Sequence, residues 1–175
     1  TDAIDNSAGV NSSDLEVNIK IALGSLVAVG TMTYEQRNEF LASMTTEVAG
    51  LCLANNYLQS LALSLAEREA ATAFGDHRAL IDYLEARGQL HRAIEFLPDD
   101  AGLDERAAQG RGLTRPELAV LLAYAKNSLN ADLVASRVPD DPYLAKELFR
   151  YFPDRLAEQH RDSIANHRLR REVIA

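Results

Sequence analysis

The sequence has no tryptophan, one cysteine and few aromatic residues, which make up 6% of its 175 positions. A single cysteine excludes an internal disulfide and is typical of a reducing compartment. Cys52 lies in an apolar run, so we expect a buried thiol and not a nucleophile. No uninterrupted apolar stretch is long enough for a membrane-spanning helix, and no targeting segment is recognisable. We therefore expect a cytoplasmic protein that does not enter a membrane.

Basic residues are also scarce. The chain has 18 Lys and Arg residues and 26 Asp and Glu residues, which gives a net charge of −8. Binding to phosphate groups needs clustered cations, so this balance argues against nucleic acid or an anionic membrane as the main partner. The chain begins without Met, and its end, HRLRREVIA, still has a helical pattern without a stop signal. We therefore expect a piece of a longer chain.

Strand patterns are nearly absent, because no alternating β-branched run is bounded by turns. Helical periodicity dominates instead. Leu15, Ile19 and Leu23 recur at four-residue steps, and Ser13 with Glu16 has the spacing of a capping box at a helix start. We predict an all-α fold, an irregular multi-helix bundle of about seven to nine helices with no substantial sheet.

Capping signals predict where the other helices begin and end. The helix after Thr114 is apolar around much of its circumference, so we expect it to lie at the centre of the core. The predicted boundaries are a start at Thr33, a helix from Thr45 or Thr46 to about Phe74, a stop and new start at Gly75-Asp76, an end at Gly88, a short helix from Leu90 to Phe96, and starts at Pro98-Asp99, Thr114, Pro139-Asp140-Asp141 and Pro153-Asp154.

Motifs for metal binding or phosphate binding are missing. The acidic pairs after proline fit helix caps better than a calcium loop, which alternates carboxylates and needs a glycine. His160 and His167 could share a helix face, but the arginines from 168 to 171 indicate a solvated basic face and not a metal site. The Gly-rich nucleotide loops are absent. We predict no metal ion.

The opening stretch, TDAIDNSAGVNSSDLEVNIK, admits two interpretations. It is either a plain loop that caps a helix, or a turn with a binding role. In the second interpretation the Asn6 amide and the hydroxyls of Ser7, Ser12 and Ser13 surround Gly9, where a ligand can approach the backbone closely. The helix N-terminus beside them would attract a carboxylate. The residue pattern alone leaves both open.

Long motifs run through the chain: TDAIDNSAGVNSSDLEVN, RNEFLASMTTEVAGLCLANNYLQSLALSLAE, IEFLPDD, GLTRPELAVLLAYAK, PDDPYL and HRLRREVIA. The first resembles the segment that closes the catalytic region of the large NAD-specific bacterial glutamate dehydrogenases. The others resemble the helical C-terminal region that follows in that family, so the resemblance covers essentially the whole chain. It implies that residues 1–30 end the catalytic region and form a connecting helix, and that residues 31–175 form a C-terminal helical domain.

The resemblance also implies binding roles. The smaller glutamate dehydrogenases carry a related Asn-Ala-Gly-Gly-Val turn, followed by Ser and then Glu, which Asn6, Gly9, Val10, Ser13 and Glu16 match. By this resemblance Asn6 lies near the nicotinamide end of NAD, and Val10 lines the substrate pocket. Ser13 would donate a hydrogen bond to the side-chain carboxylate of glutamate.

The reaction implied for the parent enzyme converts L-glutamate, NAD⁺ and water to 2-oxoglutarate, ammonium and NADH. The segments that carry the family's catalytic lysine and aspartate are absent, as is the nucleotide-binding loop. We therefore assign no catalytic residue to this chain. We expect the isolated chain to be inactive and to bind NAD poorly.

The helical region then has another role in the parent, which we expect to be a homo-oligomer. It could brace the catalytic domain through the helix from Leu15 to Leu26, or transmit an allosteric or oligomeric signal; we favour bracing and assembly. The alternative is a free-standing helical protein-interaction or regulatory module, including one that binds DNA through residues 114–129. The net charge of −8 and the apolar character of that helix count against DNA.

Overall fold

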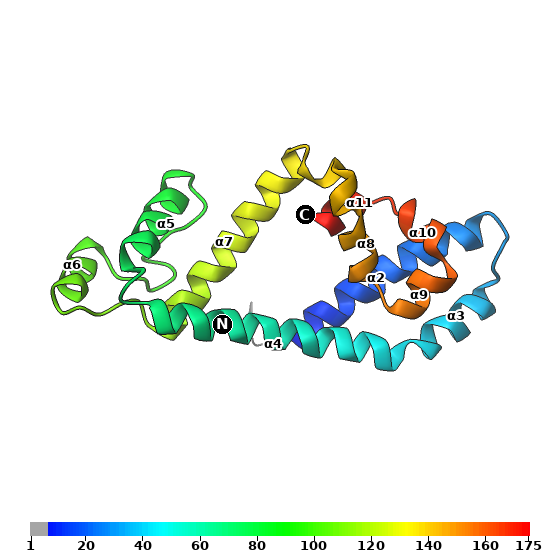
Figure 1. Cartoon of the computed structure of the whole chain (residues 1–175), viewed down its shortest axis with the longest axis horizontal. Helices are drawn as coiled ribbons and strands as arrows, with labels where there is room; N and C mark the ends of the chain where they lie inside the picture. The colour runs from blue at the N-terminus through cyan, green and yellow to red at the C-terminus, as the bar shows by residue number, and fades with distance from the viewer. Residues whose placement is uncertain (1–6) are drawn as a thin grey trace. The chain divides into compact units, whose positions relative to one another are not determined.

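The computed structural model describes residues 7–175, which form ten α-helices and two short 3-10 helices without a strand (Figure 1). Seven of these α-helices have seven or more residues, so the predicted all-α class is confirmed. No helix from residue 7 onward is both long and apolar enough to span a bilayer. In chain order the elements are α2 (Ser7–Ala28), α3 (Tyr34–Ser43), α4 (Thr45–Glu69), α5 (Phe74–Ala86), α6 (Asp100–Ala108), α7 (Arg115–Ala135), η1 (Val138–Asp140), η2 (Pro142–Leu144), α8 (Ala145–Tyr151), α9 (Asp154–Gln159), α10 (Arg161–Ala165) and α11 (Arg170–Ile174).

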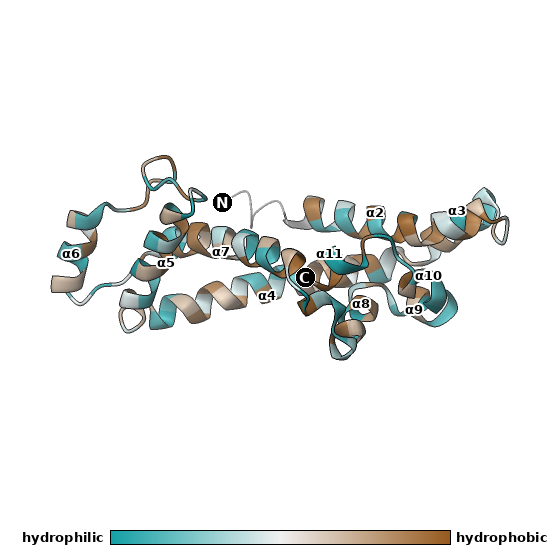
Figure 2. Ribbon diagram, turned by 90° about the horizontal axis from the view of Figure 1, so that it is seen from above, coloured by the Kyte–Doolittle hydropathy of each residue, from teal (hydrophilic) through white to brown (hydrophobic). Residues whose placement is uncertain are grey.

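The helices belong to two compact units. Among the described residues, the first unit comprises 57–131, and the second comprises 7–56 together with 132–175. The boundaries fall inside α4 and α7, so each of these helices contributes to both units. Hydrophobic and hydrophilic residues alternate along the long helices (Figure 2).

The first unit has an aliphatic core around α7. Leu118, Ala119 and Leu121 of α7 are buried there, which confirms the predicted place of this helix in a core. Gly112, just before α7, approaches the turn after α4 so closely that a Cβ atom at this position would lie 2.3 Å from the backbone of Ala70. The rest of the buried cluster consists of Leu63, Ala70, Phe74, Ile81, Leu84, Leu90, Leu97, Leu103 and Leu113.

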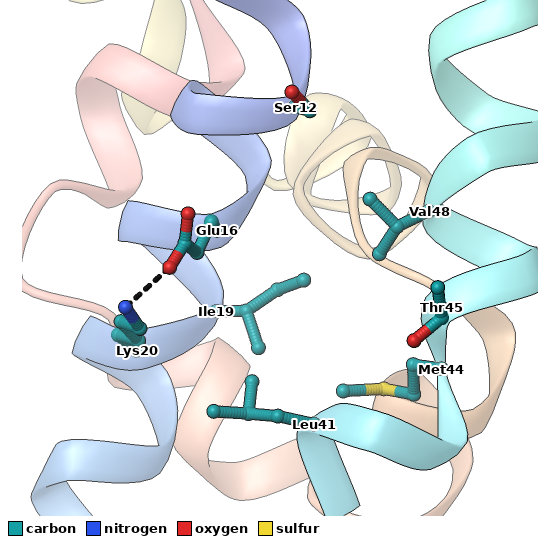
Figure 3. Close-up of a pocket in the computed structure, with 8 residues that line it drawn as sticks. All are labelled: Ser12, Glu16, Ile19, Lys20, Leu41, Met44, Thr45 and Val48. Atoms are coloured by element: carbon teal, nitrogen blue, oxygen red, sulfur yellow. Dashed lines mark hydrogen bonds and ion pairs between the residues drawn. The ribbon is translucent and has the colours of Figure 1, made fainter. Parts of the chain in front are cut away.

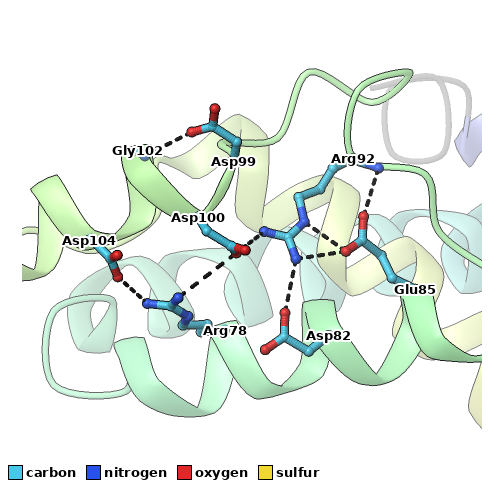
Figure 4. A network of polar contacts seen from close by, with 8 residues as sticks. All are labelled: Arg78, Asp82, Glu85, Arg92, Asp99, Asp100, Gly102 and Asp104. Carbon is cyan, nitrogen blue, oxygen red and sulfur yellow. Dashed lines mark hydrogen bonds and ion pairs between the residues drawn. The ribbon is translucent and has the colours of Figure 1, made fainter.

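An arginine fixes the segment between α5 and α6 (Figure 4). The Arg92 guanidinium donates to Glu85 Oε2 at 2.8 Å, to Asp82 Oδ1 at 2.9 Å and to Asp100 Oδ1 at 2.8 Å. The hydrogen bond to Glu85 is the main cause of a raised pKa of Arg92. The helix predicted from Leu90 to Phe96 is wrong, because this segment forms turns that follow the Arg92 contacts, with Phe96 at a φ of 56°.

The second unit is built on α2. Leu15, Ile19 and Leu23 are at most 2% exposed and pack with residues from α3, α8, α9 and α10. Cys52 belongs to the same cluster and is 7% exposed, so the predicted burial of its thiol is confirmed. The other buried members are Ala22, Met44, Leu148, Phe152, Leu156 and Ile164.

Several predicted caps are confirmed. Thr33 Oγ1 accepts from the Gln36 backbone at 3.2 Å, and the Thr33 N–H donates to Gln36 Oε1 at 2.9 Å. Asp99 Oδ1 accepts from the Gly102 N–H at 2.8 Å at the start of α6. Gly88 follows the last turn of α5 at a φ of 66°, the left-handed conformation that favours glycine at a helix end.

Two of the predicted boundaries in the first unit are wrong. Helix α4 ends at Glu69, and turns occupy residues 70–73 before α5 begins at Phe74. Gly75 and Asp76 therefore lie in the first turn of α5 and do not separate the two helices. Gly75 adopts helical geometry because the aliphatic core around Phe74 and Ile81 outweighs its low helix propensity.

Candidate substrate-site edge on helix α2

Helix α2 begins earlier than its sequence signals predict. It covers Ser7–Ala28, so Ser13 lies in the second turn and does not cap the helix. The predicted turn around Gly9 is wrong for the same reason. Ser12 Oγ donates to the Gly9 carbonyl at 3.1 Å, which shows a small polar residue bonding to its own helix. The attraction of a helix N-terminus for anions therefore does not act at Ser13.

The predicted substrate residues nevertheless lie together. Gly9, Val10, Ser13, Asp14 and Val17 line one shallow hollow on the outward face of α2. Val10 is 58% exposed and Val17 is 51% exposed, which is high for apolar side chains. The third predicted site residue, Asn6, lies outside the described residues. Two of the three predicted site residues, Val10 and Ser13, thus lie on an accessible surface, with the Ser13 hydroxyl between Val10 and Val17.

The opposite face of α2 is buried inside its own unit. The stripe from Leu15 to Leu26, which we expected to brace a catalytic domain, packs on this chain's own helices instead. Bracing of a catalytic domain through the Leu15–Leu26 helix would therefore use the outward face of this helix, and it stays a prediction. Burial of this face holds α2 in place, so the outward face with Val10 and Ser13 is presented on a fixed helix.

Polar contacts also hold α2. Tyr151 of α8 donates its hydroxyl hydrogen to Asp14 Oδ2 at 2.5 Å and accepts from Asn18 Nδ2 at 2.9 Å. Burial and the Asp14 carboxylate raise the pKa of Tyr151, so its hydroxyl stays protonated and can donate. Since Asp14 follows Ser13 directly, these bonds fix the rotation of α2 at the candidate site.

Two histidines lie where the sequence does not predict them. His167 is 3% exposed, its Nε2 is 3.1 Å from the Asn18 carbonyl oxygen, and its ring contacts Phe152. His160 packs edge-on against Phe40 with 4.8 Å between ring centroids. The predicted solvated face shared by His160 and His167 is wrong, because the chain leaves the helix at residues 166–169 and turns His167 inward.

The buried His167 predicts a pH dependence of stability. Burial lowers its pKa in the folded chain, and burial also lowers the pKa of His160. These histidines therefore bind protons at a higher pH in the unfolded chain than in the folded chain. As a result, the free energy of unfolding decreases as the pH falls below about 6.5. Urea unfolding of the chain at pH 7.5 and 5.5 measures this loss.

His167→Gln is the matched variant, because it cannot titrate and its amide can still donate to the Asn18 carbonyl. We expect a smaller loss of stability between the two pH values than in the unaltered chain. Equal losses in both proteins would contradict the assignment of the pH dependence to His167.

A second hollow lies between α2, α3 and α4, with a volume of about 250 Å³. Ile19, Met44 and Val48 are among the apolar side chains that point into it, and Glu16 forms an ion pair with Lys20 at its rim (Figure 3). Glu16, which matches the family pattern, thus faces a different hollow from Ser13. Within residues 7–175 no group of three His, Cys, Asp or Glu side chains could hold a metal ion.

Comparison with known proteins decides the family. Residues 1–66 match the family described as bacterial NAD-glutamate dehydrogenase, catalytic domain, and residues 110–175 match glutamate dehydrogenase, C-terminal. The whole chain is 51% identical to an NAD-specific glutamate dehydrogenase of Halomonas elongata. The chain belongs to the bacterial NAD-glutamate dehydrogenase family. Similar proteins of this name occur in Pseudomonas aeruginosa, with 50% identity over the whole chain, and in Mycobacterium tuberculosis, with 44% identity over 99% of it.

The chain spans 11% of the length of each of these glutamate dehydrogenases. The catalytic-domain match ends at residue 66, within α4, and the C-terminal match begins at residue 110, shortly before α7. The candidate site on α2 therefore falls inside the catalytic-domain match of this glutamate dehydrogenase segment. The division that we predict at residue 30 stays a prediction.

Proposed function

We propose that this chain is a part of an NAD-dependent glutamate dehydrogenase and supplies one edge of its glutamate site. The parent reaction is the conversion of L-glutamate, NAD⁺ and water to 2-oxoglutarate, ammonium and NADH. The similarity along the whole chain supports the assignment to this enzyme. The observation that carries the site is the exposure of Val10 and Ser13 on one outward face of α2, which lies within the catalytic-domain match.

Each site residue has a simple role in this proposal. The Ser13 hydroxyl donates a hydrogen bond to the side-chain carboxylate of glutamate, and Val10 contacts its methylene groups. Asn6 lies near the nicotinamide of NAD, which the rest of the parent binds. A neutral hydroxyl cannot balance the carboxylate charge, so cationic groups of the remaining enzyme complete the site. The role of this chain is to orient the substrate, and the proton and hydride transfers take place on groups outside it.

The remaining helices support the catalytic region. The buried cluster of the second unit and the polar contacts of Asp14 and Tyr151 keep α2 in a fixed position. We propose that the chain alone does not oxidise glutamate and binds NAD poorly, because it lacks the family's catalytic and nucleotide-binding segments. The parent would be a cytoplasmic homo-oligomer.

Ser13→Ala in the full-length parent tests the proposal. A hydrogen bond to a charged group contributes about 1.5–3 kcal/mol, so we expect the KM for glutamate to rise roughly tenfold to a hundredfold. The KM for NAD should change little, because the Ser13 hydroxyl contacts the substrate and not the cofactor. Initial rates of NADH formation across glutamate and NAD concentrations measure both values.

Ser25→Ala is the control for this experiment. Ser25 lies on the same helix, and its hydroxyl donates to the Ala22 carbonyl at 2.6 Å, so its loss changes α2 without touching the outward hollow. We expect unaltered kinetics from it. An unchanged glutamate KM in Ser13→Ala would contradict the proposed site and leave α2 as support structure.

A further inference from the structure

The part of α4 in the first unit carries an exposed apolar stripe. Leu58 is 58% exposed, Leu61 is 38% exposed and Leu65 is 43% exposed, and the exposed Ala62 lies between the last two. The spacing of three, four and seven residues places them on one side of the helix. We call these four residues the α4 stripe.

The core of the first unit does not use this stripe. Leu63 of α4 is buried in that core, with Ala66 packed against it. These two residues lie three positions apart, on a different side of the helix from the α4 stripe. A helix that is apolar on two sides needs two neighbours. Within its own unit the described chain supplies a neighbour for only one side of this part of α4.

Ionic and polar contacts fix this part of the helix. Arg115 of α7 donates to Ser64 Oγ at 3.1 Å and to Glu67 Oε2 at 2.9 Å, and Lys126 Nζ lies 3.2 Å from Gln59 Oε1. The α4 stripe therefore lies on a helix whose rotation is set, and its leucines stay on the surface. A preformed row of leucines at helical spacing is suited to a complementary apolar surface.

The family match indicates what covers the stripe. The match to the bacterial catalytic domain runs to residue 66, so all four residues of the α4 stripe lie inside it, next to its end. The chain spans only 11% of the related enzymes, so most of such an enzyme lies outside this chain. We propose that the α4 stripe packs against an apolar surface of the remaining catalytic region of the same polypeptide.

This inference rests on the proposed function and adds a second contact to the bracing expected from the Leu15–Leu26 helix. It assigns a contact with the catalytic region to the part of α4 that lies in the first unit. The candidate substrate face on α2 belongs to the second unit. The helical region would then contact the catalytic region through two separate surfaces of different chemistry.

Site-specific photo-crosslinking in the full-length parent tests the contact. Benzoylphenylalanine at position 61 should form an adduct with a peptide of the catalytic region that lies outside residues 1–175. The same group at position 60 is the control, because Ser60 is exposed on α4 but lies off the stripe. We expect at least tenfold more adduct from position 61, within a single polypeptide, as measured by denaturing gels and peptide mass spectrometry.

Other cross-linking outcomes overturn the inference. An adduct between two polypeptides would make the α4 stripe an interface between copies. An adduct with another residue of the present chain, or equal adducts from positions 60 and 61, would remove the catalytic region as its partner. The glutamate KM of Ser13→Ala tests the substrate site independently, so the failure of one proposal does not imply the failure of the other.

A substitution supplies the second measurement. Leu61 is 38% exposed, so the Leu61→Glu substitution in the isolated chain measures the part of any stability loss that arises within the chain itself. In the full-length parent we expect it to lower the Tm by several degrees and to expose the segment near residue 66 to proteases, while Ser60→Glu does neither. An unchanged Tm in Leu61→Glu would overturn the inference.

Discussion

Gly112→Ala should destabilise the first unit by about 3 kcal/mol or more. A Cβ at this position would lie 2.3 Å from the carbonyl carbon and oxygen of Ala70, a distance that no rotamer change can relieve because both are backbone atoms. Overpacking of this kind costs about 1–3 kcal/mol, and occasionally more, because the backbone has to shift. Urea unfolding of the chain, followed by circular dichroism, measures the change in the free energy of unfolding.

Gly24→Ala is the matched control for this substitution. Gly24 lies inside α2, and a Cβ there would meet no atom within 4 Å. Alanine in a helix is more stable than glycine by about 0.5–1 kcal/mol, so this variant should be slightly more stable than the unaltered chain. The same glycine-to-alanine substitution should thus lower the free energy of unfolding at position 112 and raise it at position 24. Equal effects would contradict the close packing of Gly112 against the Ala70 backbone.

Part of the fold is predictable because local and tertiary preferences agree. The capping box at Thr33 uses side chains three residues apart, so its geometry follows from the sequence alone. Gly88 ends α5 because its left-handed backbone conformation suits glycine. Along α7 the apolar pattern is long enough to require burial on its own. Each of these features depends on a few neighbouring residues and not on the rest of the chain.

The predictions that failed concern segments where distant contacts dominate. The pattern from Leu90 to Phe96 suits a helix, but Arg92 binds three carboxylates from α5 and α6 and holds the segment in turns. His167 has arginines around it in the sequence, yet it is buried against Phe152. At the start of α2, Ser13 has the right spacing for a cap, but the helix had already begun at Ser7.

Only part of the candidate site can be predicted from the sequence. The resemblance supplied Val10 and Ser13, and helical spacing is enough to place them on one face. No sequence signal indicates that Asp14 bonds to Tyr151, because 137 positions separate them. The exposed leucines of α4 look like core residues in the sequence. Only the structure shows that Leu63 is buried while Leu61 is exposed.

The two buried clusters make separate energetic units. One cluster draws on residues 63–121, and the other draws on residues 15–52 and 148–164. A core substitution should therefore act mainly on the unit that contains it. Since α4 and α7 continue through both units, these two helices are the link through which a substitution in one unit would affect the other. Comparison of variants in the two cores measures that coupling.

Phe152→Ala should destabilise the second unit by about 3–5 kcal/mol, the usual cost of removing a buried aromatic side chain. Phe152 is 1% exposed and contacts the ring of His167. Phe96→Ala is the control, because Phe96 is 90% exposed and its loss should change stability by only about 0.5 kcal/mol. Thermal and urea unfolding of both variants give the two values. Equal destabilisation would contradict the assignment of Phe152 to the core.

The same substitution connects the core to the candidate site. Phe152 belongs to the buried cluster that holds Ile19 and Leu23, so its removal leaves a cavity against the inner face of α2. A loosened α2 would present Ser13 less consistently to glutamate. In the full-length parent, Phe152→Ala should therefore raise the KM for glutamate, while Gly112→Ala, which acts in the other cluster, should lower stability with a smaller effect on that KM. A KM that responds equally to both would show that the two units support the substrate face together.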